Sequence, residues 1–119
     1  MIDRIRLTAA AKIQLSTLKR KTGIEHYNSI CRHALCISLA NPSMPPEEEF
    51  NFNGGIEIDW RTVTGGNEAF YLNLLLLRIQ KDGGAADAES VKRVCAFHLH
   101  RGLSYLAGKY DEYILMALA

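Results

Sequence analysis

Residues 4–24, RIRLTAAAKIQLSTLKRKTGI, form the stretch from which the fold is predicted. In its first four positions, polar Arg4 and Arg6 alternate with apolar Ile5 and Leu7. A period of two is typical of a β-strand with one buried face. We therefore expect a short strand whose two arginine side chains point away from the core.

Two helices are expected to follow this strand. Thr8 is a good N-cap for a helix over residues 9–22, and Gly23 suits the position just after a helix end, where a left-handed backbone is common. A second helix is predicted over residues 25–39 and ends before Asn41–Pro42. Its buried face should contain Tyr27, Ile30, Cys31, Ala34, Leu35 and Ser38.

After the second helix, the chain is predicted to lack regular structure over residues 41–55 and then to become extended. Residues 41–55 hold all three prolines and the acidic run Glu47–Glu49, which favours a linker or a covering segment. The alternation in GIEIDW, residues 55–60, predicts a strand or an extended arm. One side of it carries Ile56, Ile58 and Trp60.

The last part of the sequence predicts further helices. A helix over residues 66–80 is apolar nearly all round in its second half, so we expect it to be buried in the fold or in an oligomer interface. A long helix over residues 88–107 has Asp87 as its N-cap, and DEYILMALA, residues 111–119, predicts a final short helix.

The order strand, helix, glycine turn, helix is that of a ribbon-helix-helix unit. In that fold, two chains pair their strands into a ribbon whose outward side chains, here Arg4 and Arg6, enter the DNA major groove. A lone two-stranded ribbon is barely stable, so the helices of an oligomer must supply the core. Arg4 and Arg6 as plain solvent-facing residues remain an equally open interpretation.

We therefore expect a single, mainly α domain that spans residues 1–119 and forms oligomers. It would consist of a ribbon-helix-helix-like unit over residues 1–40, a proline-rich and acidic linker over residues 41–55, and a strand or arm with helices over residues 56–119.

The composition is that of an ordinary globular domain, but its charge is uneven. The 119 residues are 48% hydrophobic and 23% charged, with a formal net charge of +1. Residues 1–46 carry seven basic groups and two acids, a net charge of +5, whereas residues 47–119 carry seven basic groups and eleven acids, a net charge of −4. This asymmetry predicts a basic working face on the first half, or head-to-tail self-association.

Neither a signal peptide nor a membrane segment is expected. The start MIDRIRLT has no apolar core after its charges, and AFYLNLLLLRI, residues 69–79, is too short to span about 30 Å of hydrocarbon. Cys31, Cys36 and Cys95 are an odd number without paired spacing, which favours reduced thiols in a cytoplasmic protein.

The basic run Lys19–Lys21 has two interpretations. Basic residues in a last helical turn complement the helix dipole by about 0.3–1 kcal/mol and need no ligand. On a helical wheel, however, Lys12, Ser16 and Lys19 share one sector with Arg20 at its edge, while Lys21 points away. The core face of this helix is expected to consist of Ala11, Leu15, Leu18 and Thr22.

The stretch FHLHRG, residues 97–102, contains side chains of the kind that bind metals or take part in catalysis, but their spacing disfavours a common site. His98 and His100 lie two apart and on a helix face about 200° from each other, so they do not converge on a metal. We expect packing or an interface here, with DNA contact by Arg101 as an alternative. No glycine pair has the lysine and the context of a phosphate-binding loop. We thus expect no catalytic residue, no metal site and no cofactor.

Three blocks of the sequence resemble a known family in the family's own order. RIRLTAAAKIQLSTLKRKTGIEHYNSICRHALCISLANPSMPP, IEIDW and FHLHRGLSYLAG are similar to the DndE family of bacterial DNA sulfur-modification proteins. The resemblance implies a small subunit of the phosphorothioation system, in which sulfur replaces a non-bridging oxygen of the DNA backbone. It also implies a ribbon-helix-helix-related fold, a homotetramer, and binding to double-stranded DNA with a preference for nicked duplex. Sulfur mobilisation and ATP-dependent chemistry would belong to other phosphorothioation proteins, as partners.

Together, the basic half and the resemblance predict a DNA-binding subunit without catalysis of its own. The alternatives are a nuclease that makes the nick, an adaptor whose acidic half docks the other modification proteins, and a repressor that reads sequence through Arg4 or Arg6. Contacts to the DNA backbone are expected from Lys12, Lys19, Arg20, Lys21, Arg4, Arg6 and Arg32.

Overall fold

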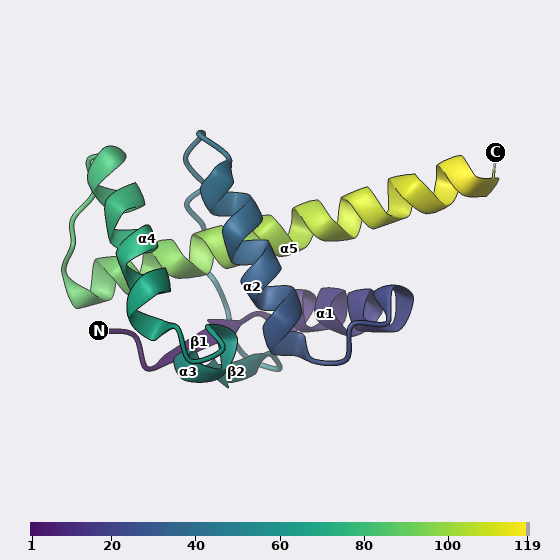
Figure 1. Ribbon diagram of the computed structural model, residues 1–119, viewed down its shortest axis with the longest axis horizontal. Coiled ribbons are helices and arrows are strands. Elements are labelled where there is room, and N and C mark those ends of the chain that lie inside the picture. Colours follow the sequence, from purple (N-terminus) through teal and green to yellow (C-terminus); the bar gives the residue numbers. More distant parts are fainter. Residues whose placement is uncertain (119) are drawn as a thin grey trace.

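The computed structural model describes the backbone of residues 1–118 and the side chains of residues 1–109. It is mainly helical, with one small sheet (Figure 1). The elements in chain order are β1 (Arg4–Leu7), α1 (Ala9–Thr22), α2 (Tyr27–Ala40), β2 (Ile56–Asp59), α3 (Trp60–Val63), α4 (Glu68–Lys81) and α5 (Ala88–Leu118).

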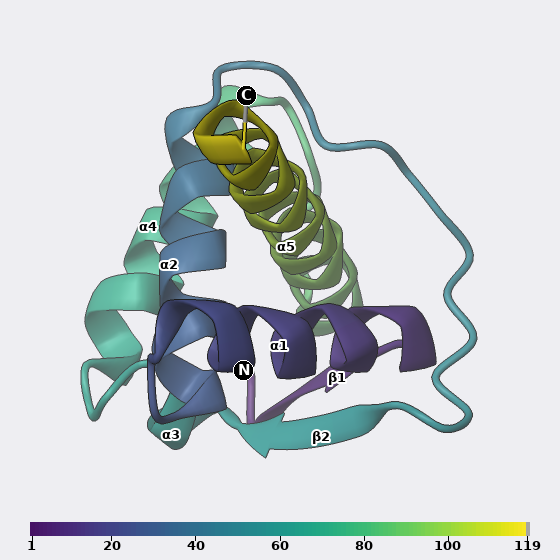
Figure 2. The same cartoon turned by 90° about the vertical axis from the view of Figure 1, so that its right-hand side faces the viewer.

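The long helix α5 is the element around which the others pack. It contacts α1, α2, α4 and β1. Figure 2 shows α2 and α4 on one side of α5, and α1 with the sheet below it. The core lies between these elements and includes Leu15 of α1, Leu35 of α2, Leu75 of α4, and Leu99 and Leu103 of α5, all fully buried.

The beginning and end of α1 confirm the sequence prediction. The Thr8 side chain caps the helix by accepting a hydrogen bond from the backbone N–H of Ala11 at 3.1 Å. Gly23 ends the helix in the left-handed region, with φ of 74°. One face residue was predicted wrongly: Thr22 is exposed, and its hydroxyl donates to the Leu18 carbonyl instead of entering the core.

The strand β1 pairs with β2 of the same chain. The two strands are antiparallel, with Arg4 opposite Asp59 and Leu7 opposite Ile56. Ile5 and Leu7 are buried and the two arginines are exposed, as the alternation predicts. This intrachain partner was not predicted: residues 41–55 return the chain from α2 to the sheet, where β2 pairs with β1 (Figure 2). Pairing of β1 with the strand of a second chain stays a prediction.

One helical prediction is tested only in part, and another needs correction. Within the single chain, α4 buries Leu75, Arg78 and Ile79, while Phe70 and Leu77 are 60% and 63% exposed. Burial of the exposed face in an oligomer interface stays a prediction. The final short helix is not separate, because α5 continues to Leu118. A single glycine, Gly108, does not end a helix that neighbouring residues favour. No helix in the described part of the chain is long and apolar enough to cross a membrane.

The helices α2 and α5 cross at a glycine. A Cβ atom on Gly102 would overlap the backbone of Ala34, including its carbonyl oxygen. Both residues are buried, so this contact lies inside the packed core. The closest approach of these two helices therefore requires the absence of a side chain at position 102.

Gly102→Ala is expected to destabilise the protein by about 1–3 kcal/mol or more, because the added methyl group forces α2 and α5 apart in a close-packed core. Gly108→Ala on the same helix is the matched control. Nothing lies within 4 Å of a Cβ at Gly108, so this change should be neutral or stabilising by up to about 1 kcal/mol. Urea denaturation of both variants measures the difference, and equal midpoints would contradict the role assigned to the crossing.

Candidate nucleic-acid interface

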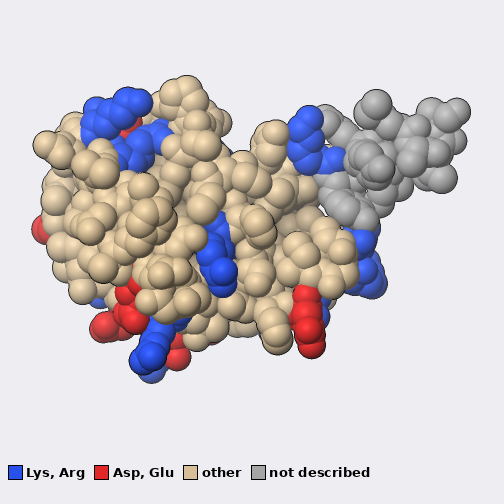
Figure 3. Space-filling model, in the orientation of Figure 1, with Lys and Arg blue, Asp and Glu red and all other residues tan. Residues whose placement is uncertain are grey.

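Three basic side chains of α1 are exposed on the sector that the helical wheel predicts. Ala11, Leu15 and Leu18 turn into the core, which leaves Lys12, Lys19 and Arg20 on the outside. Within the described residues, no hydrogen bond or ion pair involves the side chain of Lys12 or Arg20. We call Lys12, Lys19 and Arg20 the α1 stripe. Basic atoms gather over the C-terminal end of α1 in the space-filling view (Figure 3).

One member of the α1 stripe is oriented by an aromatic ring across the glycine turn. The Lys19 ammonium lies 5.5 Å from the ring centre of Tyr27, the first residue of α2. An exposed cation–π contact of this kind is worth about 0.5–1 kcal/mol. It directs the Lys19 side chain along the surface without neutralising its charge.

Arg32 and Lys21 are placed differently from the α1 stripe. Arg32 is partly buried, and its Nε donates to the Val63 carbonyl at 2.8 Å, which ties α2 to the end of α3. Its guanidinium also fills the space beside Gly65. Lys21 is only partly exposed, consistent with its position away from the stripe on the wheel. The structure thus brings three of the seven predicted DNA-binding residues together on one exposed surface.

Arg4 and Arg6 face outward from the sheet but lie beside acids. The Arg6 Nε is 3.0 Å from a Glu57 carboxylate oxygen, and Arg4 lies 3.5 Å from Asp59 and 3.6 Å from Glu57. In the view of Figure 3, blue and red atoms adjoin where the sheet lies. Exposed ion pairs contribute little stability, but they balance the charge of this surface. The alternation of acids in IEID was the sequence signal for this pairing.

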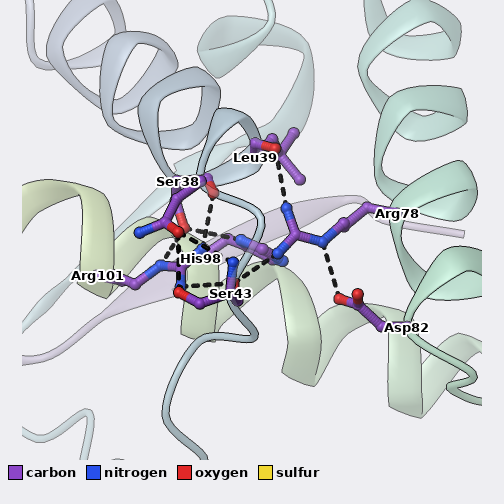
Figure 4. Close-up of polar contacts among 8 residues, drawn as sticks. Ser38, Leu39, Ser43, Arg78, Asp82, His98 and Arg101 are labelled. Atoms are coloured by element: carbon purple, nitrogen blue, oxygen red, sulfur yellow. Dashed lines mark hydrogen bonds and ion pairs between the residues drawn. The ribbon is translucent and has the colours of Figure 1, made fainter.

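The FHLHRG stretch forms an internal network (Figure 4). The Arg101 Nε donates to the Ser38 hydroxyl at 2.8 Å, and this hydroxyl lies 2.8 Å from Nδ1 of buried His98. The hydroxyl oxygen has two lone pairs, so it can accept from Arg101 and at the same time either donate to Nδ1 or accept from it. The other ring nitrogen of His98, Nε2, is buried without a hydrogen-bond partner in the described part of the chain.

Two arginines of this network hold the chain where it leaves α2. Arg101 donates to the carbonyls of Ser38 and Ser43, and buried Arg78 donates to those of Leu39 and Ser43 (Figure 4). The Arg78 Nε also pairs with Asp82 at 2.8 Å. The packing role predicted for FHLHRG fits these contacts. The role of Arg78 was missed, since an arginine inside an apolar helix gives no sign of its partners.

His100 performs a second structural task. Its Nε2 accepts the backbone N–H of Thr8 at 3.2 Å, while Nδ1 lies 2.7 Å from the Ala96 carbonyl. Phe50 stacks on the His100 ring with centroids 4.0 Å apart. Burial lowers the pKa of His100, so the neutral form that this acceptor role needs is favoured.

The thiols and acids do not converge on a common centre. Cys31 and Cys95 are buried, and burial raises the pKa of each thiol to about 12, while Cys36 is exposed. Among residues 1–109, no three His, Cys, Asp or Glu side chains come together in a way that could hold a metal ion.

Comparison with known proteins finds a family and a solved structure that resemble this chain. The sequence profile of the family described as "DNA sulphur modification protein DndE" matches residues 4–113. A crystal structure of DndE from Escherichia coli B7A, described as involved in DNA phosphorothioation modification, superimposes with a TM-score of 0.73 at 21% sequence identity. The match covers 89% of this chain and 98% of that one. No curated protein sequence matches significantly.

The network around His98 predicts a loss of stability in acid. Burial, followed by the charges of Arg78 and Arg101, lowers the pKa of His98 from 6.5 to about 4. Between these values the unfolded chain binds a proton that the folded chain does not. The contribution of neutral His98 to the free energy of unfolding is therefore fully present above about pH 6.5. It decreases by roughly 3 kcal/mol as the pH falls towards 4.

Urea denaturation between about pH 7 and about pH 4.5 tests this for the wild type and for His98→Gln. The variant should be less stable at neutral pH and should show a flatter pH dependence. His33→Gln changes an exposed histidine on α2 and should follow the wild type. Parallel pH profiles for His98→Gln and the wild type would show that other groups cause the acid effect.

Proposed function

The chain belongs to the DndE family of DNA sulphur modification proteins, and on this premise we propose that it is a DNA-binding subunit of a phosphorothioation system. It holds the DNA backbone through the α1 stripe and performs no catalytic step itself. The sulfur chemistry is supplied by other proteins of the system, which are its partners.

The observation that carries this proposal is the exposure of Lys12, Lys19 and Arg20 on one surface of α1. In contrast, Arg4 and Arg6 are matched by acids of β2, and Arg32 is bound to a carbonyl. Long basic side chains on a solvent-facing helix suit phosphate oxygens, which fix position but carry no sequence information. This supports backbone binding over sequence reading by the sheet.

A preference for nicked duplex follows from the same surface. A nick leaves the base edges unchanged but lowers the cost of bending, which for intact DNA amounts to several kcal/mol over one site. A protein that contacts backbone on both sides of a nick can therefore bring more phosphates to its basic surface. Several copies, as in a homotetramer, would enlarge this surface and steepen the salt dependence.

Exposed apolar residues support an additional adaptor role. Phe70 and Leu77 of α4 are more than half exposed, and the face formed by α4 and α2 is largely uncharged in Figure 3. An uncharged surface does not attract phosphate but is suited to protein contacts. DNA binding by α1 and protein contacts by α4 would then occupy different sides of the molecule.

The double variant Lys19→Ala/Arg20→Ala is expected to bind DNA more weakly and with less salt dependence. Each phosphate that the protein no longer neutralises reduces the slope of log K against log salt by about 0.9, so the removal of two cations reduces it by roughly 2. Fluorescence anisotropy with nicked and intact duplexes of one sequence, over a range of salt concentrations, measures both slopes. The wild type should bind the nicked duplex more tightly.

Lys92→Ala/Arg93→Ala is the matched control, because it removes the same charge from exposed residues of α5. Its slope should equal that of the wild type. An equal reduction in both double variants would assign DNA binding to the overall charge and not to the α1 stripe. Equal affinity for the two duplexes would disprove the nick preference while leaving backbone binding intact.

A further inference from the structure

One edge of the sheet has unpaired backbone groups. The Trp60 N–H donates to the Asp3 carbonyl at 2.8 Å, and this pair continues the register of β1 and β2. In an antiparallel ladder, hydrogen-bonded pairs alternate with non-hydrogen-bonded ones. Arg4 and Arg6 are therefore non-hydrogen-bonded positions, and their N–H and C=O groups point to the edge of β1 away from β2. No described residue pairs with them.

A cleft of about 730 Å³ runs along this edge. It is lined by Arg4 and Arg6, whose side chains lie on the outer face of β1, and also by Ile5, whose side chain lies on the inner face. A cavity that touches both faces of a strand must pass along its edge. No residue of β2 lines it, so this is the unpaired edge.

The other walls of the cleft come from α5 and from residues 48–52, which we call the strap. The strap contributes Glu48, Glu49, Phe50 and Phe52, and α5 contributes Glu89, Lys92, Arg93 and Ala96. Stacking on His100 fixes Phe50, and the Arg6 guanidinium lies 5.1 Å from the ring centre of Phe52.

The charges in the cleft favour a basic occupant. Glu57 and Asp59 balance Arg4 and Arg6, as the ion pairs show. Of the other charged residues that line the cleft, Glu48, Glu49 and Glu89 carry three negative charges, and Lys92 and Arg93 carry two positive ones. Once Arg4 and Arg6 are paired with the acids of β2, an excess of one negative charge remains, which favours lysine and arginine side chains over phosphate.

We propose that this cleft binds an extended segment of a partner protein, in which basic and apolar residues alternate, as an added strand on β1. Main-chain hydrogen bonds to Arg4 and Arg6 provide the attachment, as in other cases of strand addition. Apolar side chains of the segment face Ile5 and Ala96, and basic ones face Glu48 and Glu49. The site is separate from the α1 stripe, so it is independent of DNA binding.

The test uses the full-length protein and a fluorescent hexapeptide of alternating arginine and valine. Fluorescence anisotropy should show saturable binding of this peptide. A peptide with glutamate in place of each arginine should bind about tenfold more weakly. Two further peptides carry N-methyl groups at every valine or at every arginine. Strand addition requires that at least one of them loses binding, because one alternate set of amides faces β1. Equal binding of all the arginine peptides would overturn the proposal.

A matched pair of variants addresses the protein side. Arg6→Pro removes the edge N–H and should weaken binding by about tenfold, whereas Arg6→Ala keeps this N–H and should change binding much less. Proline is tolerated at strand edges, and circular dichroism checks the fold. If Arg6→Pro fails to fold, the N-methylated peptides decide the question on the wild type.

Two other occupants are possible, and each would overturn the proposal. Displacement of the peptide by hexathymidylate would identify the cleft as a nucleic-acid site. Light scattering tests whether the wild type is instead a dimer. If Arg6→Pro dissociates this dimer and Arg6→Ala does not, the edge of β1 pairs with β1 of a second copy.

Discussion

The crossing of α2 and α5 at Gly102 is the contact on which the remaining architecture depends. Because Gly102 has no side chain, α5 lies against the backbone of Ala34. Ser38, one turn further along α2, then reaches His98 and Arg101. Without this close approach, the hydroxyl could not join the two helices, and buried His98 would lack its hydrogen-bond partner.

The consequences of the crossing extend to the sheet. Arg78 and Arg101 fix the chain at Ser43, just after α2, and the strap further along the chain places Phe50 on His100. The same histidine accepts the N–H of Thr8, at the junction of β1 and α1. The five arginines with assigned partners, Arg4, Arg6, Arg32, Arg78 and Arg101, serve the fold or balance its acids. This suits the forked guanidinium, whereas the side chains of Lys12 and Lys19 stay exposed on α1.

The sequence allowed the local structure to be predicted better than the pairing between distant segments. Alternation in RIRL, the Thr8 cap and Gly23 identified β1 and α1, because these signals lie within a few residues of one another. The partner of β1 could not be predicted, since two helices and a segment without regular structure separate it from β2. Likewise, the wheel placed Lys12 and Lys19 correctly, but it gave no sign that Arg32 would bind the Val63 carbonyl.

The hydrogen bond from Thr8 to His100 has a consequence for the order of folding. It joins residues 92 positions apart, and it satisfies a backbone group at the very start of the first helix. Closing so long a loop costs entropy before any contact is gained, and contacts of this kind slow folding. As the chain emerges from the ribosome, β1 has no intrachain strand partner until β2 is made, and the Thr8 N–H has no His100 acceptor until the first part of α5 is made. The junction of β1 and α1 is thus among the first parts of the chain to be synthesised, but its last contact comes from residues synthesised much later.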